Sequence, residues 1–178
     1  MQKEDRVVDF SEGSIVKVNT KDLICFQQYA QTNTKKKQYR LCLHNSPESE
    51  LNEMFICRCR EDYSRPERHP NVETHIIIEG REAVVLFSED GEIEDVFLLD
   101  KSGGYLAYRI NERLYHFTLV LSEKAIDYEV KAGPFIKENT EYPQWAPNGR
   151  DEYENEQFIN TIRKKIESKI NPKAGVIL

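Results

Sequence analysis

The sequence predicts a mainly β protein, built as one antiparallel sandwich or barrel with a helix near each end of the chain. The chain has 178 residues, which is the length of a single domain. Between residues 54 and 131, short runs rich in β-branched and aromatic residues alternate with turn signals. No helical period separates these runs, so we expect the strands to pair antiparallel rather than through βαβ units.

The segment before the β-rich region is expected to hold an extended arm and one helix. Residues 1–18 alternate loosely between apolar and polar side chains, which predicts a short strand or an arm. Asn19 and Thr20 can cap a helix that spans Lys21–Ala30. Residues 32–37 are polar and basic, as is typical of a loop, and Arg40–His44 predicts a strand.

Seven further strands are expected in the β-rich region. They are Met54–Arg58, Thr74–Ile78, Ala83–Phe87, Val96–Leu99, Tyr105–Ile110, Tyr115–Leu121 and Ala125–Val130. The last element is a helix over Asp151–Ile170, with acids near its start, lysines near its end and one apolar face. We expect it to pack on the outside of the β core. The predicted units are an arm and helix at 1–38, a barrel at 39–135, and a tail and helix at 136–178.

Composition and charge argue against several classes of function. The net charge is −6 and no basic block is present, so binding to a nucleic-acid backbone is not expected. No apolar stretch approaches the ~20 residues of a membrane helix. No apolar signal core follows Met1–Arg6, which predicts a cytoplasmic protein. The four cysteines lack metal-finger spacing, and we expect them to be reduced and partly buried.

One segment combines acidic and imidazole groups at strand spacing. Side chains two apart in a strand share a face, so Glu67 and His69 are expected to point the same way. After a turn at Pro70 and Asn71, Glu73 and His75 share a face in the next strand. Another imidazole, His116, comes from a strand much later in the chain. If these faces look into a barrel, the carboxylates and imidazoles converge, and a divalent cation would remove the cost of burying them together.

The same residues carry a resemblance to a known family. The spacing from His69 through Glu73 to Gly80 resembles the first cupin motif, and His116 lies where the second motif has its metal-binding histidine. More specifically, the chain resembles the WbuC-type cupin fold metalloproteins. That likeness rests on Arg40 and His44, the Glu129–Phe135 run and the Trp145–Pro147 tail, and it covers roughly residues 35 to 148.

The resemblance implies a double-stranded β-helix, or jelly-roll, barrel that holds one divalent metal ion in its mouth. The implied ligands are Glu67, His69, Glu73 and His116, and the implied context is synthesis of surface polysaccharide. Glu67 stands where the motif usually has a histidine. A set of two histidines and two carboxylates favours manganese or iron(II) over copper, while zinc stays a further option. If Glu67 does not ligate, two histidines and Glu73 remain, a set that suits iron(II).

Other residues have more than one interpretation. Glu67 and His75 are candidates for proton transfer, but Glu67 could instead pair with Arg65 or Arg68 at the surface. His75 could simply line the pocket. Lys131, Arg40 and His44 are candidate substrate-binding residues, since a guanidinium can hold a carboxylate or phosphate. For Arg40 and His44, an ordinary ion pair at the end of a strand is an equally good interpretation of the sequence. Trp145 could stack on a sugar ring, but we expect it to plug the barrel beside Gly133–Phe135.

Three functions are compatible with this pattern. The first is a metalloenzyme in which the metal acts as a Lewis acid on a sugar or sugar nucleotide, as in an isomerase or epimerase. The second is an iron(II)-dependent dioxygenase. The third is a non-catalytic module that binds a metal or a sugar. A small sugar-like ligand is the expected partner, and the N-terminal arm could pair two copies of the chain in a homodimer.

Overall fold

A computed structural model describes residues 6–24 and 38–170 of the chain. Nine strands follow one another in this part. They are β1 (Arg6–Phe10), β2 (Gln38–Cys42), β3 (Leu51–Cys59), β4 (Glu73–Glu79), β5 (Arg81–Phe87), β6 (Ile93–Asp100), β7 (Ala107–Ile110), β8 (Tyr115–Val120) and β9 (Lys124–Ala132). A short 3-10 turn, η1 (Lys137–Asn139), and the helix α2 (Glu152–Ile170) come after them.

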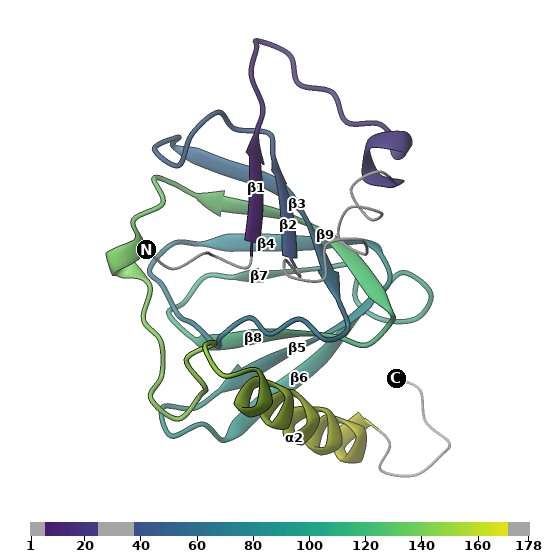
Figure 1. The fold of residues 1–178 in the computed structure, drawn as a ribbon, viewed down its shortest axis with the longest axis vertical. Coiled ribbons are helices and arrows are strands. Elements are labelled where there is room, and N and C mark those ends of the chain that lie inside the picture. The colour runs from purple at the N-terminus through teal and green to yellow at the C-terminus, as the bar shows by residue number, and fades with distance from the viewer. Residues whose placement is uncertain (1–5, 25–37, 171–178) are drawn as a thin grey trace.

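The strands form two sheets that face each other (Figure 1). The larger sheet has the order β1-β2-β3-β9-β4-β7, and the smaller one has the order β6-β5-β8. A β-bridge between Glu67 and His116 adds Glu67 to the free edge of β8, while Arg68 bridges to Glu141. If this bridge is counted as a short strand between β3 and β4, consecutive strands from β3 to β9 alternate between the two sheets, as in a double Greek key. The exception is the pair β5 and β6, which both belong to the smaller sheet. This strand order is a jelly roll, so the predicted double-stranded β-helix is confirmed.

The N-terminal segment extends the larger sheet. β1 pairs in parallel with β2, whose other edge pairs antiparallel with β3. Residues 20–24 are helical and begin the predicted N-terminal helix, while the rest of that helix lies outside the described residues. Cys42, Cys57 and Cys59 are free thiols, as expected, and Cys25 lies outside the described part of the chain.

The smaller sheet is covered on its outer face by α2 (Figure 1). The outward side chains of β5 and β8, among them Phe87 and Phe117, pack against Ile159, Ile162 and Ile166 of the helix in one buried cluster. The other face of β5 points into the barrel, where Val84 packs with Ile77 and Leu99. Because β5 is buried on both faces, its sequence is a continuous apolar run rather than an alternating one. The predicted packing of the C-terminal helix is therefore confirmed.

Gly80 makes the tight connection from β4 to β5. Its φ angle is +80°, a conformation that side-chain-bearing residues rarely adopt. A Cβ atom there would also collide with the backbone carbonyl of Lys124. The glycine of the sequence motif is thus a geometric requirement of the turn that joins the two sheets. No helix among the described residues is long and apolar enough to cross a membrane.

Candidate metal centre and ligand pocket

The inner face of the larger sheet carries charged side chains in rows that run across the strands. β9 alternates, so that Asp127, Glu129 and Lys131 all face inward and are buried. Glu129 stands opposite His75 of β4, and His75 stands opposite Tyr108 of β7. These three side chains form the first row.

The second row lies one step further along the strands. Lys131 of β9 stands opposite Asn52 on one side and opposite Glu73 on the other. All three residues are buried. Strand register alone thus brings one amide, one ammonium group and one carboxylate into a line across β3, β9 and β4.

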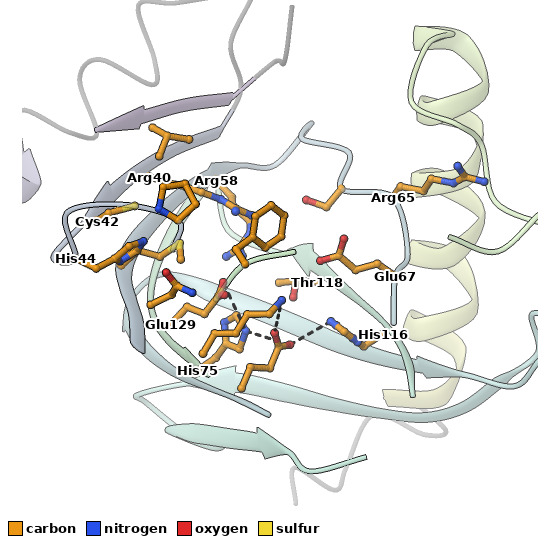
Figure 2. A pocket seen from close by; sticks show the side chains of 18 of the residues that line it. Arg40, Cys42, His44, Arg58, Arg65, Glu67, His75, His116, Thr118 and Glu129 are labelled. Carbon is orange, nitrogen blue, oxygen red and sulfur yellow. Dashed lines mark ion pairs between the residues drawn. The ribbon is translucent and has the colours of Figure 1, made fainter. Parts of the chain in front are cut away.

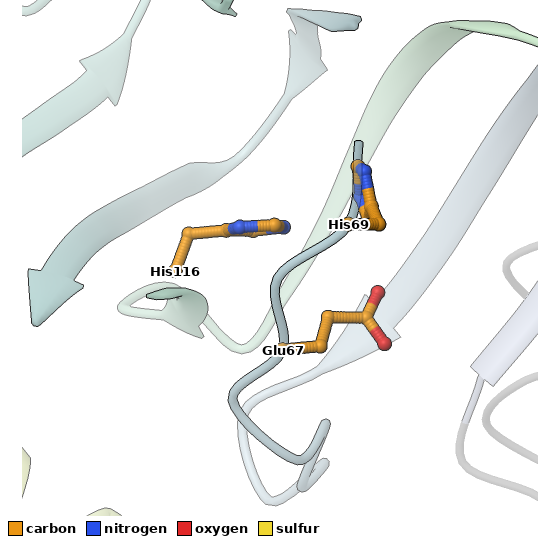
Figure 3. Close-up of side chains that lie close together, drawn as sticks. All are labelled: Glu67, His69 and His116. Carbon is orange, nitrogen blue, oxygen red and sulfur yellow. The ribbon is translucent and has the colours of Figure 1, made fainter. Parts of the chain in front are cut away.

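The opposite wall of the barrel supplies two imidazoles. His116 is on β8, and the bridge between Glu67 and His116 holds residues 67–69 beside that strand. The rings of His69 and His116 meet edge to face, with their centroids 5.3 Å apart. Glu67, His69 and His116 can each present one ligand atom within 4.8 Å of the other two (Figure 3).

Glu73 joins the two walls. Its Oε2 atom lies 3.0 Å from Nε2 of His69, and its Oε1 atom lies 3.1 Å from Nε2 of His116. Oε1 is also 3.5 Å from Nε2 of His75, and Oε2 is 3.5 Å from Nζ of Lys131. The side chain of Glu73 is only 3% exposed, so these contacts replace water almost completely. The structure therefore brings together His69, Glu73 and His116, with Glu67 beside the two imidazoles.

Both imidazoles are oriented by the backbone. Nδ1 of His69 donates to the carbonyl oxygen of Asn71 at 2.9 Å, and Nδ1 of His116 donates to that of Leu114 at 3.0 Å. With the proton on Nδ1, the lone pair of the neutral ring is on Nε2, which faces Glu73. This backbone support of the second ring nitrogen is typical of metal-ligating histidines.

The residues present fit a metal ion. Nε2 of His69 and Oε1 of Glu73 are buried without a hydrogen-bond partner in the described structure. A lone pair that faces a carboxylate is unfavourable, and a cation between the two atoms would satisfy both. Two imidazole nitrogens and carboxylate oxygens are a donor set that manganese, iron and zinc accept.

The electrostatics of the cluster follow from these contacts. Burial acts to raise the pKa of Glu73, but the close contacts with the imidazoles of His116, His69 and His75 outweigh it and hold this pKa well below its usual range. Burial acts to lower the pKa of His116, and the contact with Glu73 reverses that effect and raises the pKa. Without a metal ion, the carboxylate draws a proton onto His116. A cation would take the place of that proton.

A second layer of charge lies beneath His75. Nδ1 of His75 is 2.6 Å from Oδ2 of Asp127, and Asp127 also pairs with Arg58, which is 3.3 Å from Glu82. Burial acts to lower the pKa of His75, but Asp127 and Glu73 raise it to about 10. In this setting His75 holds a proton. The role of proton acceptor that the sequence suggested for His75 stays a prediction.

A pocket of about 380 Å³ opens above this cluster (Figure 2). Its volume suits a small ligand. Aromatic side chains such as Phe10, Phe135 and Tyr142 are among the residues that line it, and each of these three is 40–50% exposed. The three predicted substrate-binding residues, Arg40, His44 and Lys131, all line the same pocket. Glu67 lines it as well, while Arg68 pairs with Glu89 and Glu141 instead.

The prediction for Trp145 is wrong. Its ring packs on Phe87 and Tyr115, outside the barrel, and stacks on Phe158 of α2. Phe135, its expected neighbour, is one of the pocket-lining residues instead. The indole is drawn to the apolar seam between the smaller sheet and the helix, because that seam offers aromatic partners on several sides.

Sequence reasoning missed several residues of the site. Asp127 and Glu129 received no role, and neither did Arg58, Tyr108 or Asn52. A signal was present in β9, where charged residues at positions 127, 129 and 131 alternate with apolar ones. Such alternation usually marks a strand with a solvated face. Here it marks a charged face that is turned inward.

The comparisons with known proteins are distant. A family model described as a domain of unknown function (DUF6016) matches residues 18–99, less than half of the chain. No curated protein is similar enough in sequence to count as a relative.

Among solved structures, a Shewanella oneidensis protein aligns with a TM-score of 0.49 and 9% identity over 64% of this chain and 74% of its own. A cupin 2 conserved barrel domain protein from Rhodopseudomonas palustris aligns at 0.47 and 16%, over 60% and 66%. An oxalate decarboxylase variant from Bacillus subtilis aligns at 0.43 and 18%, over 52% of this chain and only 24% of its own. The chain thus spans about a quarter of the decarboxylase.

Proposed function

We propose that this chain is a cupin-type metalloprotein that binds one divalent cation between Glu67, His69, Glu73 and His116. The observation that carries the proposal is the convergence of two backbone-oriented Nε2 atoms on one buried carboxylate, at 3.0 and 3.1 Å. The Nε2 atom of His69 supports it, because its contact with Oε2 of Glu73 lacks the geometry of a hydrogen bond and a cation would satisfy both buried atoms.

The charge balance of the barrel interior supports the same proposal. Among the described residues, four carboxyl groups are more than nine-tenths buried at or beneath the pocket, and two permanently charged cations and the protonated His75 are buried with them. The acids are Glu73, Glu82, Asp127 and Glu129, and the cations are Arg58 and Lys131. An uncompensated buried charge is very costly, so an additional positive charge is needed in this volume. A divalent cation would supply it.

The donor set favours manganese or iron(II). Two imidazoles and two carboxylates form a harder set than three imidazoles and one carboxylate. If Glu67 stays out of the coordination sphere, His69, His116 and Glu73 form the two-histidine, one-carboxylate set that iron(II) proteins use with open positions. The half-buried Glu67 is then available for proton transfer.

The proposed reaction is an isomerase- or epimerase-like conversion of a small polar substrate such as a sugar or sugar nucleotide. When bound, the cation would supply Lewis acidity toward a carbonyl or hydroxyl oxygen. Within the pocket, Glu67 and His75 would carry protons, while Arg40, His44 and Lys131 would bind and orient the substrate. The likeness of the sequence to WbuC-type proteins supports a place in surface polysaccharide synthesis. The aromatic side chains that line the pocket suit a sugar ring.

Oxygen chemistry on iron(II) is the alternative that the same ligand set favours. The two-histidine, one-carboxylate arrangement serves either reaction, so the metal and the substrate decide between them. Oxygen consumption with candidate diols would favour the oxygenase. A chain that binds metal or sugar without turnover would be the binding module.

The decisive experiment measures metal in the protein itself. Wild-type protein and the double variant His69→Ala/His116→Ala are purified without added metal, and their content of manganese, iron and zinc is determined by mass spectrometry. The wild type is expected to hold about one ion per chain, before or after reconstitution, and the double variant to hold almost none.

His44→Ala is the matched control. His44 lines the same pocket, but its Nδ1 atom bonds to the backbone of Glu53 and it is no part of the metal cluster. Its metal content should equal that of the wild type. The metal centre would be refuted if the wild type contained no metal and its melting temperature did not change on addition of manganese, iron or zinc. Equal loss of metal in the His44 variant would move the site elsewhere in the pocket.

A further inference from the structure

Asn52 is an unexplained polar residue in the pocket. It lines the cavity and is only 2% exposed, and neither polar atom of its amide has a hydrogen-bond partner in the described structure. Leaving a buried amide unpaired is costly, and most such groups in proteins are satisfied. An amide that is buried, unpaired and on a pocket wall is therefore a group that a ligand can satisfy.

Lys131 stands beside Asn52 on the neighbouring strand. Its ammonium group contacts Glu73 at 3.5 Å, longer than the 2.7–2.9 Å of a strong charge-assisted hydrogen bond. The described residues provide no closer partner for it. An ammonium group has three donors, so most of its hydrogen-bonding capacity is open toward the pocket.

Arg40 brings a second cation to the same cavity. It is half-buried on β2, and its Nε atom is buried without a hydrogen-bond partner among the described residues. It forms no ion pair with any carboxylate in the described structure, in contrast to Arg58, which is paired with Asp127 and Glu82. Arg40 therefore keeps its guanidinium free for an anion.

We propose that an anionic oxygen group of the ligand, either a carboxylate or a phosphate, binds between Arg40, Asn52 and Lys131. Two cations and an amide N–H offer only donors to such a group, which matches what these anions accept. The carbonyl oxygen of Asn52 can accept a hydroxyl group of the same ligand.

The position of this subsite defines the substrate class. Asn52 and Lys131 lie in one row with Glu73, so a ligand anchored there reaches the candidate metal centre. The ligand is thus a small acidic molecule, such as a sugar phosphate or a sugar acid, with its charged group at the subsite and its hydroxyl or carbonyl oxygen at the cation. This second step rests on the proposed function; the anion subsite stands without it.

Calorimetric titration of the full chain tests the subsite. Inorganic phosphate and glycerate are the two probes, each added with and without manganese. Asn52→Leu and Arg40→Gln should each weaken binding of the preferred probe by roughly tenfold or more, because each removes a hydrogen bond or a charge contact to the anion. Arg81→Gln is the matched control: it also removes one positive charge, but Arg81 is 55% exposed and pairs with Asp100, away from the pocket. Its affinity should stay within about twofold of the wild type.

The two arms distinguish the sources of the anion. Tighter binding of phosphate indicates a phosphorylated ligand, and tighter binding of glycerate indicates a carboxylate. No binding of either probe at about ten millimolar, or equal weakening by all three variants, would overturn the subsite. Retained melting temperatures and manganese binding in the variants show that they fold. If manganese does not bind but anion binding is still weakened by the Asn52 and Arg40 variants, the subsite stands and the metal proposal fails. If manganese binds but neither variant weakens anion binding, the subsite alone is refuted.

Discussion

Replacing Asp127 by asparagine should destabilise the protein strongly. Asp127 is completely buried, and it pairs with Arg58 and accepts a hydrogen bond from His75. The asparagine side chain keeps the shape and one acceptor oxygen but loses the negative charge. Among the described residues, Arg58, which is 6% exposed, then retains only Glu82 as a carboxylate partner, at 3.3 Å.

The size of the effect follows from the burial of the pair. Removing one partner of a buried ion pair costs about 3–5 kcal/mol, because the remaining charge is left in a medium of low polarity. Glu82 still compensates part of the charge of Arg58, so we expect about 3 kcal/mol, the lower end. For a chain of this size, 1 kcal/mol corresponds to about 2–4 °C in melting temperature. The expected decrease is therefore about 6–12 °C.

Thermal unfolding at pH 7, followed by circular dichroism, measures this decrease. Glu141→Gln is the matched control, since Glu141 also pairs with two arginines, Arg68 and Arg113, but at the surface. Exposed ion pairs contribute little, so its melting temperature should stay close to that of the wild type. Equal melting temperatures for the two variants would show that the Asp127 network does not stabilise the fold, and the argument from burial would be refuted.

Three further predictions concern pH, packing and metal. Burial raises the pKa of Glu82 to about 7, so its contribution to stability is present below its ordinary pKa of about 4.5 and is lost as the pH rises through about 7. Glu82→Gln should therefore be more stable relative to the wild type at pH 8 than at pH 5. An equal difference in melting temperature between the two proteins at both pH values would contradict this prediction. Ile162→Ala opens a cavity between α2 and the smaller sheet, and should lower the unfolding free energy by about 2–5 kcal/mol in a denaturant titration while metal content stays unchanged. Manganese at about 100 times its dissociation constant should raise the melting temperature of the wild type by roughly 5–10 °C, an increase that EDTA removes and that His116→Ala lacks.

The sequence predicted the β class and the side chains that share a strand face because both depend on local periodicity, while the placement of His116 beside His69 came from the resemblance to the cupin motifs. The alternation of Glu73, His75 and Ile77 in β4 is visible along the chain, and all three side chains are buried on one face. The apolar run of β5 likewise indicated a strand. The motif spacing from His69 to Gly80 added the geometry of a turn that needs glycine, and Gly80 has the positive φ angle that such a turn requires.

The rest of the site depends on strand register, which a single sequence does not contain. Asn52 and Lys131 are 79 positions apart, and only the β3–β9 pairing makes them neighbours. The inward direction of Asp127 and Glu129 depends in the same way on which face of β9 meets the smaller sheet. A strand in which charged and apolar residues alternate is normally interpreted as having one face in solvent. The charged face of β9 could not be predicted to line the pocket without knowing that the smaller sheet lies opposite it.

Glu73 belongs to one of two groups of potential ligands and contacts the imidazoles of the other, and this favours one cation over two. The second group consists of Glu73, His75 and Glu129. That group already has positive charge beside it, since Lys131 is 3.5 Å from Glu73, and the Nδ1 atom of His75 is held by Asp127. In the first group, Glu67, His69 and His116, neither imidazole contacts an ammonium or guanidinium group among the described residues, and Nε2 of His69 makes no hydrogen bond of good geometry there. A cation is therefore most needed on the side of Glu73 that faces His69 and His116, and placing one there leaves Lys131 and Asn52 to bind the ligand.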